Sequence, residues 1–584
     1  MHPRGDSSPK WSQDGTKLGF LSTRNNGDRD VWFVWLKKED WEKTKDDWED
    51  AEDDKPAKGK GKGNGKDKGK DKKKKDKKVK PVEIDFEDIH ERIEQVTRIA
   101  GNEGNLMISK DGESFYFTTN GGGRQGSPGP ASLMSIKWDG EDVKKIADKI
   151  SVFNLHLSKD GKNLYGIKRG GTFTKIKIEG GKQESLGFQA KMDINHKEER
   201  KQIFAEGWRR LRDGFYDPNF HGQDWNKLKD TYYDRCMNAS TKQDFQFFYN
   251  EMLGQLNASH MGLRGGGTPE ETQRERTGLI GIEVEPNTQG VKIIAVIPNT
   301  PADRTESKLN VGDIIRSVDG SSVNSNTNLY ALLNGKTNER ILLEVSNSAG
   351  VQREVIIRPT SSIRRQLYNA WVKERKNLTK KYSNGRLGYI HIQGMNWPSF
   401  ERFERELTAS GLGKEGLVID VRFNGGGWTT DMLMTVLSVQ QHAYTVPRGA
   451  AKDLEKEHLK FKETYPFGER LPFSSWTKPS IAMCNENSYS NAEIFSHAFQ
   501  SLGIGTLVGM PTFGAVISTG GSGLLDGSFV RMPFRGWFVK ATEKNMEWGP
   551  AVPDIEVQNA PDSKAKGEDP QLKKAVEQLL KEIK

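Results

Sequence analysis

A Ser-x-Asp-Gly tetrapeptide recurs in the first 190 residues and constrains the fold of this region more than any other feature. Its three copies occupy residues 12–15, 109–112 and 158–161. Each precedes a run of alternating apolar residues, such as KLGFLS or SFYFTT, which is typical of β-strands with one buried face. The last two copies are 49 residues apart, close to the length of one four-stranded propeller blade.

The first two copies are 97 residues apart because a charged insertion separates them, at about residues 38–80. Within it, residues 55–80 carry 14 Lys and 3 Asp, whereas the rest of the chain has 75 basic and 77 acidic residues. We expect this Lys/Gly-rich insertion to be disordered, since it has nothing to bury. Because the basicity is local, nucleic-acid binding is not expected of the chain as a whole, although the insertion could alternatively be a tether for an acidic partner or nucleic acid.

Residues 1–190 therefore predict a partial β-propeller. Two or three blades cannot close a ring, and an open ring leaves strand edges exposed. We expect either that further blades precede this sequence or that another chain completes the ring.

Residues 195–265 predict a helical subdomain. Phe204, Trp208, Leu211 and Phe215 follow a spacing of four, three and four residues, which places them on one helix face. The segment ends at NASHMGLRGGG, where Ser259 and His260 are adjacent in a loop. Taken alone, a single histidine is more often structural than catalytic.

Residues 278–360 predict a compact β-rich module that resembles a PDZ domain. Its entry, Gly278-Leu279-Ile280-Gly281, matches the loop that offers backbone N–H groups to a peptide carboxylate. In a binding PDZ domain, Leu279, Ile280 and Gly281 would supply these donors. The alternative is a domain that only packs against its neighbour.

Residues 361–560 alternate short apolar strands with helices and predict an α/β domain, followed by an amphipathic C-terminal helix within 561–584. The overall prediction is a multidomain chain of mixed β and α/β class. The buried strands are expected at residues 386–392, 416–423, 480–485 and 505–510.

Ser490 opens a predicted helix directly after one of these strands. Ser490-Asn491-Ala492-Glu493 fits a capping box, in which serine and glutamate satisfy backbone donors at the helix start. A serine at a strand-to-helix turn is also the arrangement that exposes a nucleophile beside helix N–H groups. The glycines at 425–427 could supply a second donor for an oxyanion.

The remaining composition excludes several classes of protein. No stretch reaches the roughly 18 apolar residues of a membrane span, and the start lacks the apolar run of a signal peptide. Cys236 and Cys484 give neither a disulfide framework nor a metal-binding spacing. We therefore expect a cytoplasmic protein without metal or other cofactor.

From about residue 200 onward, the sequence resembles the catalytic half of the tricorn protease family, relatives of the C-terminal processing serine peptidases. The resemblance rests on the order and spacing of several segments: GWRRLRDGFYDPNFHGQDW, EMLGQLNASHMG, IDVRFNGGG, SYSNAEIFSHAF, TFGAVIS and EWGPAVPDIEV. It implies a crotonase-like ββα catalytic domain.

The resemblance also implies a catalytic tetrad. Ser490 matches the nucleophile and His260 the general base, whereas Ser259 and Glu547 match the groups that orient the imidazole. A serine hydroxyl needs such a base, because it is a weak nucleophile at neutral pH. Glu543 is the competing candidate for the carboxylate, and we expect it to lie on the surface.

The implied oxyanion donors are the backbone N–H groups of Asn491 and Gly426. Homologues usually carry aspartate after the nucleophile, but a main-chain donor should tolerate asparagine there. A preference for basic residues is implied by an acidic specificity residue in a variable loop. Four candidates for it remain open: Glu455, Glu457, Glu463 and Glu469.

The resemblance thus predicts a serine endopeptidase or processing peptidase that forms an acyl-enzyme on Ser490. Its partners would be peptides or unfolded proteins, and it would assemble as a homo-oligomer. Two alternatives remain: a catalytically silent peptide-binding scaffold that uses the PDZ and propeller domains, and a subunit active only within a larger assembly.

Overall fold

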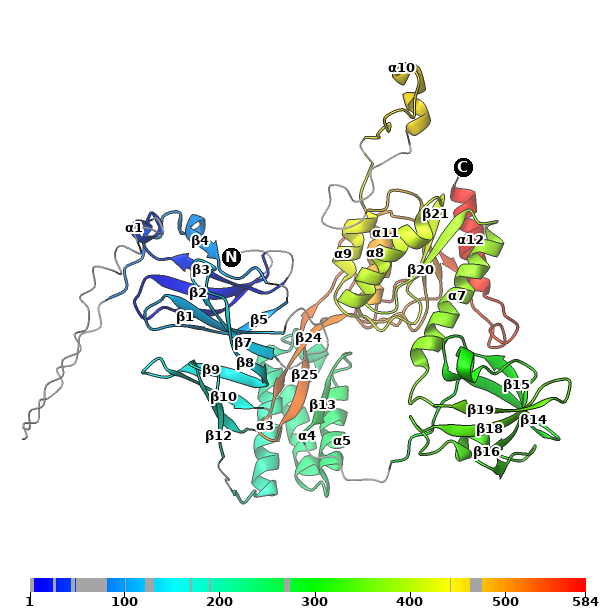
Figure 1. The fold of residues 1–584 in the computed structure, drawn as a ribbon, viewed down its shortest axis with the longest axis horizontal. Coiled ribbons are helices and arrows are strands. Elements are labelled where there is room, and N and C mark those ends of the chain that lie inside the picture. The colour runs from blue at the N-terminus through cyan, green and yellow to red at the C-terminus, as the bar shows by residue number, and fades with distance from the viewer. Residues whose placement is uncertain are drawn as a thin grey trace, which may run out of the picture. The chain divides into compact units, whose positions relative to one another are not determined.

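The computed structural model divides into two compact units, residues 1–193 and residues 194–584 (Figure 1). The charged insertion predicted at 38–80 lies largely outside the part of the chain that the structure describes. The described residues are 5–24, 28–43, 48, 81–99, 101–120, 131–168, 171–187, 191–266, 274–441, 443–462 and 475–583.

The N-terminal unit contains three four-stranded antiparallel sheets, drawn in blue to cyan in Figure 1. In each sheet, strands that follow one another in sequence are neighbours, as in a propeller blade. The first sheet comprises β1 Asp6–Trp11, β2 Lys17–Ser22, β3 Asp30–Trp35 and β4 Ile93–Gln95, with α1 Lys38–Trp41 after β3. The second comprises β5 Glu103–Ile108, β6 Ser114–Thr119, β7 Ala131–Lys137 and β8 Lys144–Ile150. The third comprises β9 Val152–Leu157, β10 Asn163–Lys168, β11 Phe173–Lys177 and β12 Gln183–Leu186.

The Ser-x-Asp-Gly repeats form the turn between the first and second strands of each sheet. In all three copies the serine hydroxyl accepts the backbone N–H five residues onward, at 2.8–2.9 Å for Ser12, Ser109 and Ser158. The glycine of each copy has φ between +74° and +80°, the left-handed region that favours glycine. The repeat is therefore a turn signal that sets the start of each second strand.

The second unit begins with a helical subdomain built from α3 His196–Gly214, α4 Trp225–Met237 and α5 Lys242–Gly254. Phe204, Trp208, Leu211 and Phe215 are all buried in its core, as their spacing predicts. This core also packs against a three-stranded sheet of order β13-β25-β24, drawn partly in orange in Figure 1. Its strands are β13 Gly262–Gly265, β24 Ile517–Gly523 and β25 Ser528–Gly536.

Residues 282–357 form a β-rich module with one short α-helix and the 3-10 turns η3 Pro301–Asp303 and η4 Thr305–Ser307, as expected for the PDZ-like region. Its strand order is β14-β15-β16-β18-β19, and β17 pairs with β16. Ile293, Ile315, Leu343 and Val345 are fully buried in its core. The elements are β14 Ile282–Asn287, β15 Gly290–Val296, β16 Ile314–Val318, β17 Ser321–Ser322, α6 Leu329–Leu332, β18 Ile341–Ser346 and β19 Gln352–Ile357.

The α/β region is a five-stranded parallel sheet of order β20-β21-β22-β23-β26. Each predicted strand is present, although each is shorter than its apolar run. The strands are β20 Leu387–His391, β21 Gly416–Asp420, β22 Ser480–Cys484, β23 Leu507–Gly509 and β26 Ile555–Glu556. The helices are α7 Arg364–Tyr382, α8 Trp397–Gly411, α9 Thr430–Leu437, α10 Leu454–Glu457, α11 Asn491–Ser501 and α12 Pro570–Glu582.

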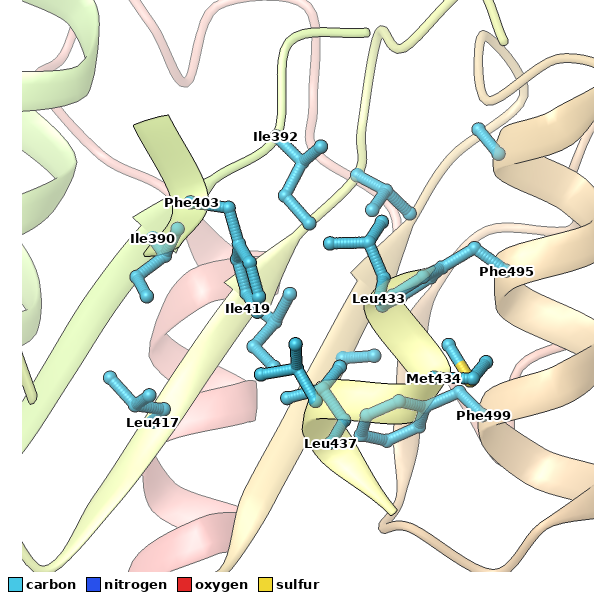
Figure 2. Close-up of a cluster of buried hydrophobic side chains, with 14 of the residues drawn as sticks. Ile390, Ile392, Phe403, Leu417, Ile419, Leu433, Met434, Leu437, Phe495 and Phe499 are labelled. Carbon is cyan, nitrogen blue, oxygen red and sulfur yellow. The ribbon is translucent and has the colours of Figure 1, made fainter. Parts of the chain in front are cut away.

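The core on one side of this sheet is formed by apolar side chains from strands and helices. Figure 2 shows Ile390 and Ile419 of the sheet on either side of Phe403 of α8, and Leu433 of α9 beside Phe495 of α11. Burying each such side chain stabilises the fold by roughly 1.5–3 kcal/mol. This packing fixes α9 and α11 against the sheet, and both helices begin beside its carboxyl edge.

The C-terminal helix α12 is anchored by a buried ion pair. The Arg422 guanidinium donates to both carboxylate oxygens of Asp569, at 2.9 Å each, and also to Asp420. Arg422 and Asp569 are each 1% exposed at the side chain. The helix predicted at the C-terminus is thereby joined to the strand end that precedes the glycine triplet.

Candidate active site

Ser490 stands at the turn between β22 and α11 with an unusual backbone conformation. Its φ is 57° and its ψ is −117°, a region that non-glycine residues rarely adopt. The Ser490 N–H donates to the Glu493 carboxylate at 2.8 Å, which forms the glutamate half of the predicted capping box. The same carboxylate accepts from Thr512 Oγ1 and from the Ala515 N–H, so the turn is held from two sides.

His260 lies within hydrogen-bond distance of the Ser490 hydroxyl. Its Nε2 is 3.0 Å from Ser490 Oγ, although 230 residues separate the two in sequence. His260 lies in the loop between α5 and β13 and has φ of 61°, in the left-handed region that non-glycine residues adopt infrequently. A neutral imidazole nitrogen at this distance can accept the hydroxyl proton.

Ser259 and Glu547 extend this pair into a chain of four residues. His260 Nδ1 is 2.7 Å from Ser259 Oγ, which donates to Glu547 Oε2 at 3.0 Å. Because the Ser259 hydroxyl gives its proton to the carboxylate, its oxygen accepts from Nδ1–H. This direction places the imidazole proton on Nδ1 and leaves the Nε2 lone pair facing Ser490.

Glu547, and not Glu543, is the carboxylate that contacts the adjacent residues Ser259 and His260 through a hydrogen bond to Ser259. Glu547 is 2% exposed and also accepts the Ser259 N–H at 2.7 Å, whereas Glu543 is exposed to solvent. The structure therefore brings together all four residues that the sequence analysis assigned to the tetrad. It leaves Glu543 on the surface, as expected.

Tyr489 is a further neighbour of the histidine that the sequence analysis did not identify. Its hydroxyl is 3.1 Å from His260 Nδ1, and its ring stacks on the imidazole at 4.7 Å with an interplanar angle of 23°. Phe513 also packs against the Tyr489 ring in a T-shaped arrangement, with the ring centroids 5.0 Å apart. The only sequence signal that could have suggested Tyr489 is its position directly before Ser490.

The imidazole is held in its neutral form. Burial lowers the pKa of His260 to about 4, and the positive charge of Arg531 acts in the same direction. At neutral pH the residue is therefore unprotonated and can act as a base.

The glycine triplet at 425–427 passes directly over the serine turn. A Cβ at Gly426 would lie 2.7 Å from Ser490 Cβ and 2.9 Å from the Asn491 nitrogen, and φ there is +86°. The Tyr489 N–H donates to the Asn424 carbonyl at 2.9 Å, which links the two turns. Only glycine fits this approach.

The two predicted oxyanion donors differ in their surroundings. Asn491 is the first residue of α11, so its N–H has no partner within the helix. The Gly426 N–H instead donates to Asn424 Oδ1 at 2.9 Å. In this conformation, Asn491 is therefore the more open donor of the two.

The Asn491 side chain has a partner at the start of α9. Its Oδ1 accepts the backbone N–H of Thr430 at 3.0 Å and lies at the same distance from the Thr430 hydroxyl oxygen. The Thr430 hydroxyl donates to the Asn491 carbonyl at 2.7 Å. These contacts join the starts of α9 and α11.

The PDZ-like loop is partly occupied by contacts within its own module. The Leu279 N–H donates to the Thr360 carbonyl at 2.8 Å and is thus engaged. Ile280 is buried, and a Cβ at Gly281 would collide with Thr300 at 2.2 Å. Binding of a peptide carboxylate by Leu279, Ile280 and Gly281 stays a prediction.

Two of the four candidates for the acidic specificity residue, Glu455 and Glu457, lie on the exposed helix α10. Lys460 pairs with Glu457 at 2.7 Å. Glu463 and Glu469 fall outside the described residues. Neither Glu455 nor Glu457 has a contact with the tetrad among the described residues, so the structure does not select one of them as the specificity residue.

Three family profiles match this chain. Peptidase family S41 matches residues 386–557, the tricorn protease C1 domain matches residues 196–254, and a PDZ domain matches residues 278–346. Ser490 and Glu547 lie within the first of these segments, whereas Ser259 and His260 fall between the second and the third.

Curated relatives and a solved structure agree with these profiles. The tricorn protease of Thermoplasma volcanium is 26% identical over 472 residues, covering 78% of this chain and 44% of the relative. Tricorn protease homolog 1 of Streptomyces coelicolor is 29% identical over 391 residues, covering 65% of this chain and 35% of the relative. A crystal structure of the tricorn protease superposes on 100% of this chain and 55% of its own, with 21% identity and a TM-score of 0.77.

The chain thus spans less than half the length of these two curated relatives. The TM-score shows the shared fold, which includes the mixed multidomain architecture and the PDZ domain predicted from the sequence. The resemblance to the tricorn protease family is confirmed.

Proposed function

We propose that this relative of the tricorn proteases is a serine endopeptidase that cleaves peptides through an acyl-enzyme on Ser490. The observation that carries the proposal is the hydrogen-bonded chain from Ser490 through His260 and Ser259 to Glu547. Nucleophile, base and orienting groups within hydrogen-bond reach are the signature of an activated serine.

In the first step, Ser490 Oγ attacks the scissile carbonyl carbon while His260 Nε2 takes the hydroxyl proton. The resulting imidazolium keeps its Nδ1–H bond to Ser259, whose hydroxyl donates to the Glu547 carboxylate. This relay stabilises the positive charge and holds the ring in place.

The tetrahedral oxyanion needs backbone donors beside Ser490. The N–H of Asn491 at the start of α11 supplies one, and the helix dipole favours the negative charge. The N–H of Gly426 supplies the second donor, once it exchanges its hydrogen bond to Asn424 Oδ1 for one to the substrate oxygen. The intermediate then collapses: the C–N bond breaks, His260 protonates the leaving amine, and water later hydrolyses the ester on Ser490.

The surface around the serine suits an extended peptide chain. Trp428 follows the glycine triplet, Phe513 packs on Tyr489, and Trp548 follows Glu547; all three side chains are at least half exposed. Exposed aromatic side chains beside a reactive serine can contact the side chains of a bound peptide. We propose unfolded or short peptides as substrates, and a cytoplasmic homo-oligomer as the acting form, by analogy with the family.

Steady-state hydrolysis of a fluorogenic peptide library tests this function. The comparison is between the unaltered chain, Ser490→Ala and the control Ser501→Ala, which removes an exposed hydroxyl from the end of the same helix. Turnover in the first and third proteins, with a loss of at least about 10³-fold in Ser490→Ala, is expected. Equal turnover in all three, or none in any, would reject the proposed activity.

A further inference from the structure

We propose that Arg531 binds a carboxylate group of the substrate beside Ser490, so that the chain prefers peptides with an acidic side chain or a free C-terminus near the cleaved bond. This inference rests on the proposed function. It departs from the preference for basic residues that the family resemblance implies, and it assigns the specificity to a residue of the β24–β25 hairpin.

The sheet register places Arg531 close to the catalytic histidine in the fold. Arg531 lies on β25, the central strand, and is paired with Gly262 of β13, two residues after His260. On its other side it is paired with Gly521 of β24. Neither glycine has a side chain that could cover the arginine.

The alternation of side chains along β25 directs Arg531 away from the helical core. Val530, its neighbour in sequence, is fully buried in that core, and Leu263 of β13 is buried there too. Because successive residues of a strand point to opposite faces, Arg531 lies on the face opposite the helices. The residue is only partly exposed, so its position is fixed more closely than that of a surface arginine.

A single hydroxyl orients the guanidinium. Arg531 Nε and Nη2 donate to Thr519 Oγ1 at 3.1 and 2.9 Å. A guanidinium has five N–H donors, so three remain for another acceptor. Across the described ranges of the chain, Thr519 is the side chain that accepts from Arg531, and no Asp or Glu lies within ion-pair distance of it. A planar array of free donors suits a carboxylate.

The positive charge of Arg531 affects the pKa of His260 and of Tyr489. It contributes to the lowered pKa of His260, and it opposes the effect of burial on the pKa of Tyr489. An unpaired cation disfavours the imidazolium that forms during acylation. A substrate carboxylate bound to Arg531 would neutralise this cation, so it should improve both binding and the chemical step.

Matched peptides separate the two sources of a carboxylate. In the first set, two peptides are compared for each position near the cleaved bond, one with Glu there and one with Gln. In the second set, a peptide with a free C-terminus is compared with the same peptide carrying a C-terminal amide. The unaltered chain should favour one carboxylate form by about 10-fold or more in kcat/KM, as expected for a charge-assisted hydrogen bond. The set that shows the preference identifies the source.

Substitution of Arg531 tests whether this residue is responsible. Arg531→Gln should abolish the preference while the neutral peptides are still cleaved, and Arg531→Lys should restore part of it. The control Arg535→Gln, an exposed position of the same strand, should keep the full preference. A preference that persists in Arg531→Gln, or its absence from the unaltered chain, would overturn the inference.

A binding measurement keeps the inference separate from the proposed peptidase activity. Fluorescence anisotropy of labelled peptides is measured on Ser490→Ala and on Ser490→Ala/Arg531→Gln, neither of which needs to turn over substrate. The single variant should bind the favoured carboxylate peptide about 10-fold more tightly than its neutral partner, and the double variant should not. Equal affinities in the single variant would reject the site even if peptidase activity were found.

Discussion

The Ser259 hydroxyl donates to the Glu547 carboxylate at 3.0 Å, and the Ser259 N–H donates to the same carboxylate at 2.7 Å. These two bonds join a loop after α5 to a loop 288 residues later. They determine which imidazole nitrogen carries the proton, because the Ser259 oxygen is left to accept from His260 Nδ1. The orientation of the His260 imidazole is therefore fixed in the protein without a bound ligand.

Ser259→Ala should lower kcat by about 10- to 100-fold and leave KM nearly unchanged, because it removes an orienting contact rather than a substrate contact. Tyr489 should limit the loss, since its hydroxyl remains 3.1 Å from His260 Nδ1. Stopped-flow or steady-state assays with one fluorogenic peptide would measure the effect.

Ser259→Ala/Tyr489→Phe removes both hydroxyls and should lose more activity than the two single changes predict together. Tyr489→Phe alone, which keeps the stacked ring, is the matched control. A double variant as active as Ser259→Ala would show that Tyr489 does not support the histidine.

The acid limb of kcat/KM should fall near pH 4 rather than near the ordinary histidine value of 6.5, because burial lowers the pKa of His260. The sign follows from the base: activity needs the neutral imidazole, so it is present above the pKa and is lost as the pH falls through it. In Arg531→Gln the limb should move to higher pH, since the cation that disfavours the imidazolium is gone.

The pH profile would be recorded with a neutral peptide, so that no substrate group titrates. Circular dichroism at each pH serves as the control for unfolding. If kcat/KM of the unaltered chain instead fell near pH 6.5, the ordinary pKa of histidine, burial would not determine the protonation of His260.

Gly426→Ala should reduce kcat/KM by about 10²-fold or more, because the new Cβ would lie 2.7 Å from Ser490 Cβ. Gly425→Ala is a close control, since a Cβ at that neighbouring position meets nothing within 4 Å. Equal loss in both variants would mean that general disturbance of the loop, and not its approach to Ser490, causes the effect.

Asp569→Ala should destabilise the second unit by roughly 3–5 kcal/mol, because it leaves the buried Arg422 without one of its two carboxylates. Asp562→Ala breaks an exposed pair with Lys566 and should cost less than about 1 kcal/mol. Urea unfolding would compare the two, and similar midpoints would contradict an anchoring role for the Arg422–Asp569 pair.

Local patterns in the sequence were sufficient to predict much of this fold. The alternating apolar residues after each Ser-x-Asp-Gly predict strands, and the structure adds why the serine recurs: its hydroxyl accepts an N–H five residues onward. Short apolar runs likewise predict the parallel strands. The strand-to-helix turn at Ser490 could be recognised because strand end and helix start are adjacent in sequence.

Pairings between distant segments could not be predicted in this way. The sheet that joins β13 to β25 brings Gly262 beside Arg531, and no periodicity in either segment encodes that register. Tyr489 gave no signal of its own, because its role depends on where the His260 ring lies. The assignments of Ser259 and Glu547 came from family resemblance, since a hydrogen bond across 288 residues leaves no local pattern.

Covalent labelling with a serine-directed fluorophosphonate, followed by mass spectrometry of the digested chain, tests the central claim most directly. The account predicts a single adduct on Ser490, formed rapidly in the unaltered chain and at least about 10³-fold more slowly in His260→Ala. No adduct at Ser490, or labelling of Ser490 at the same rate without His260, would contradict it.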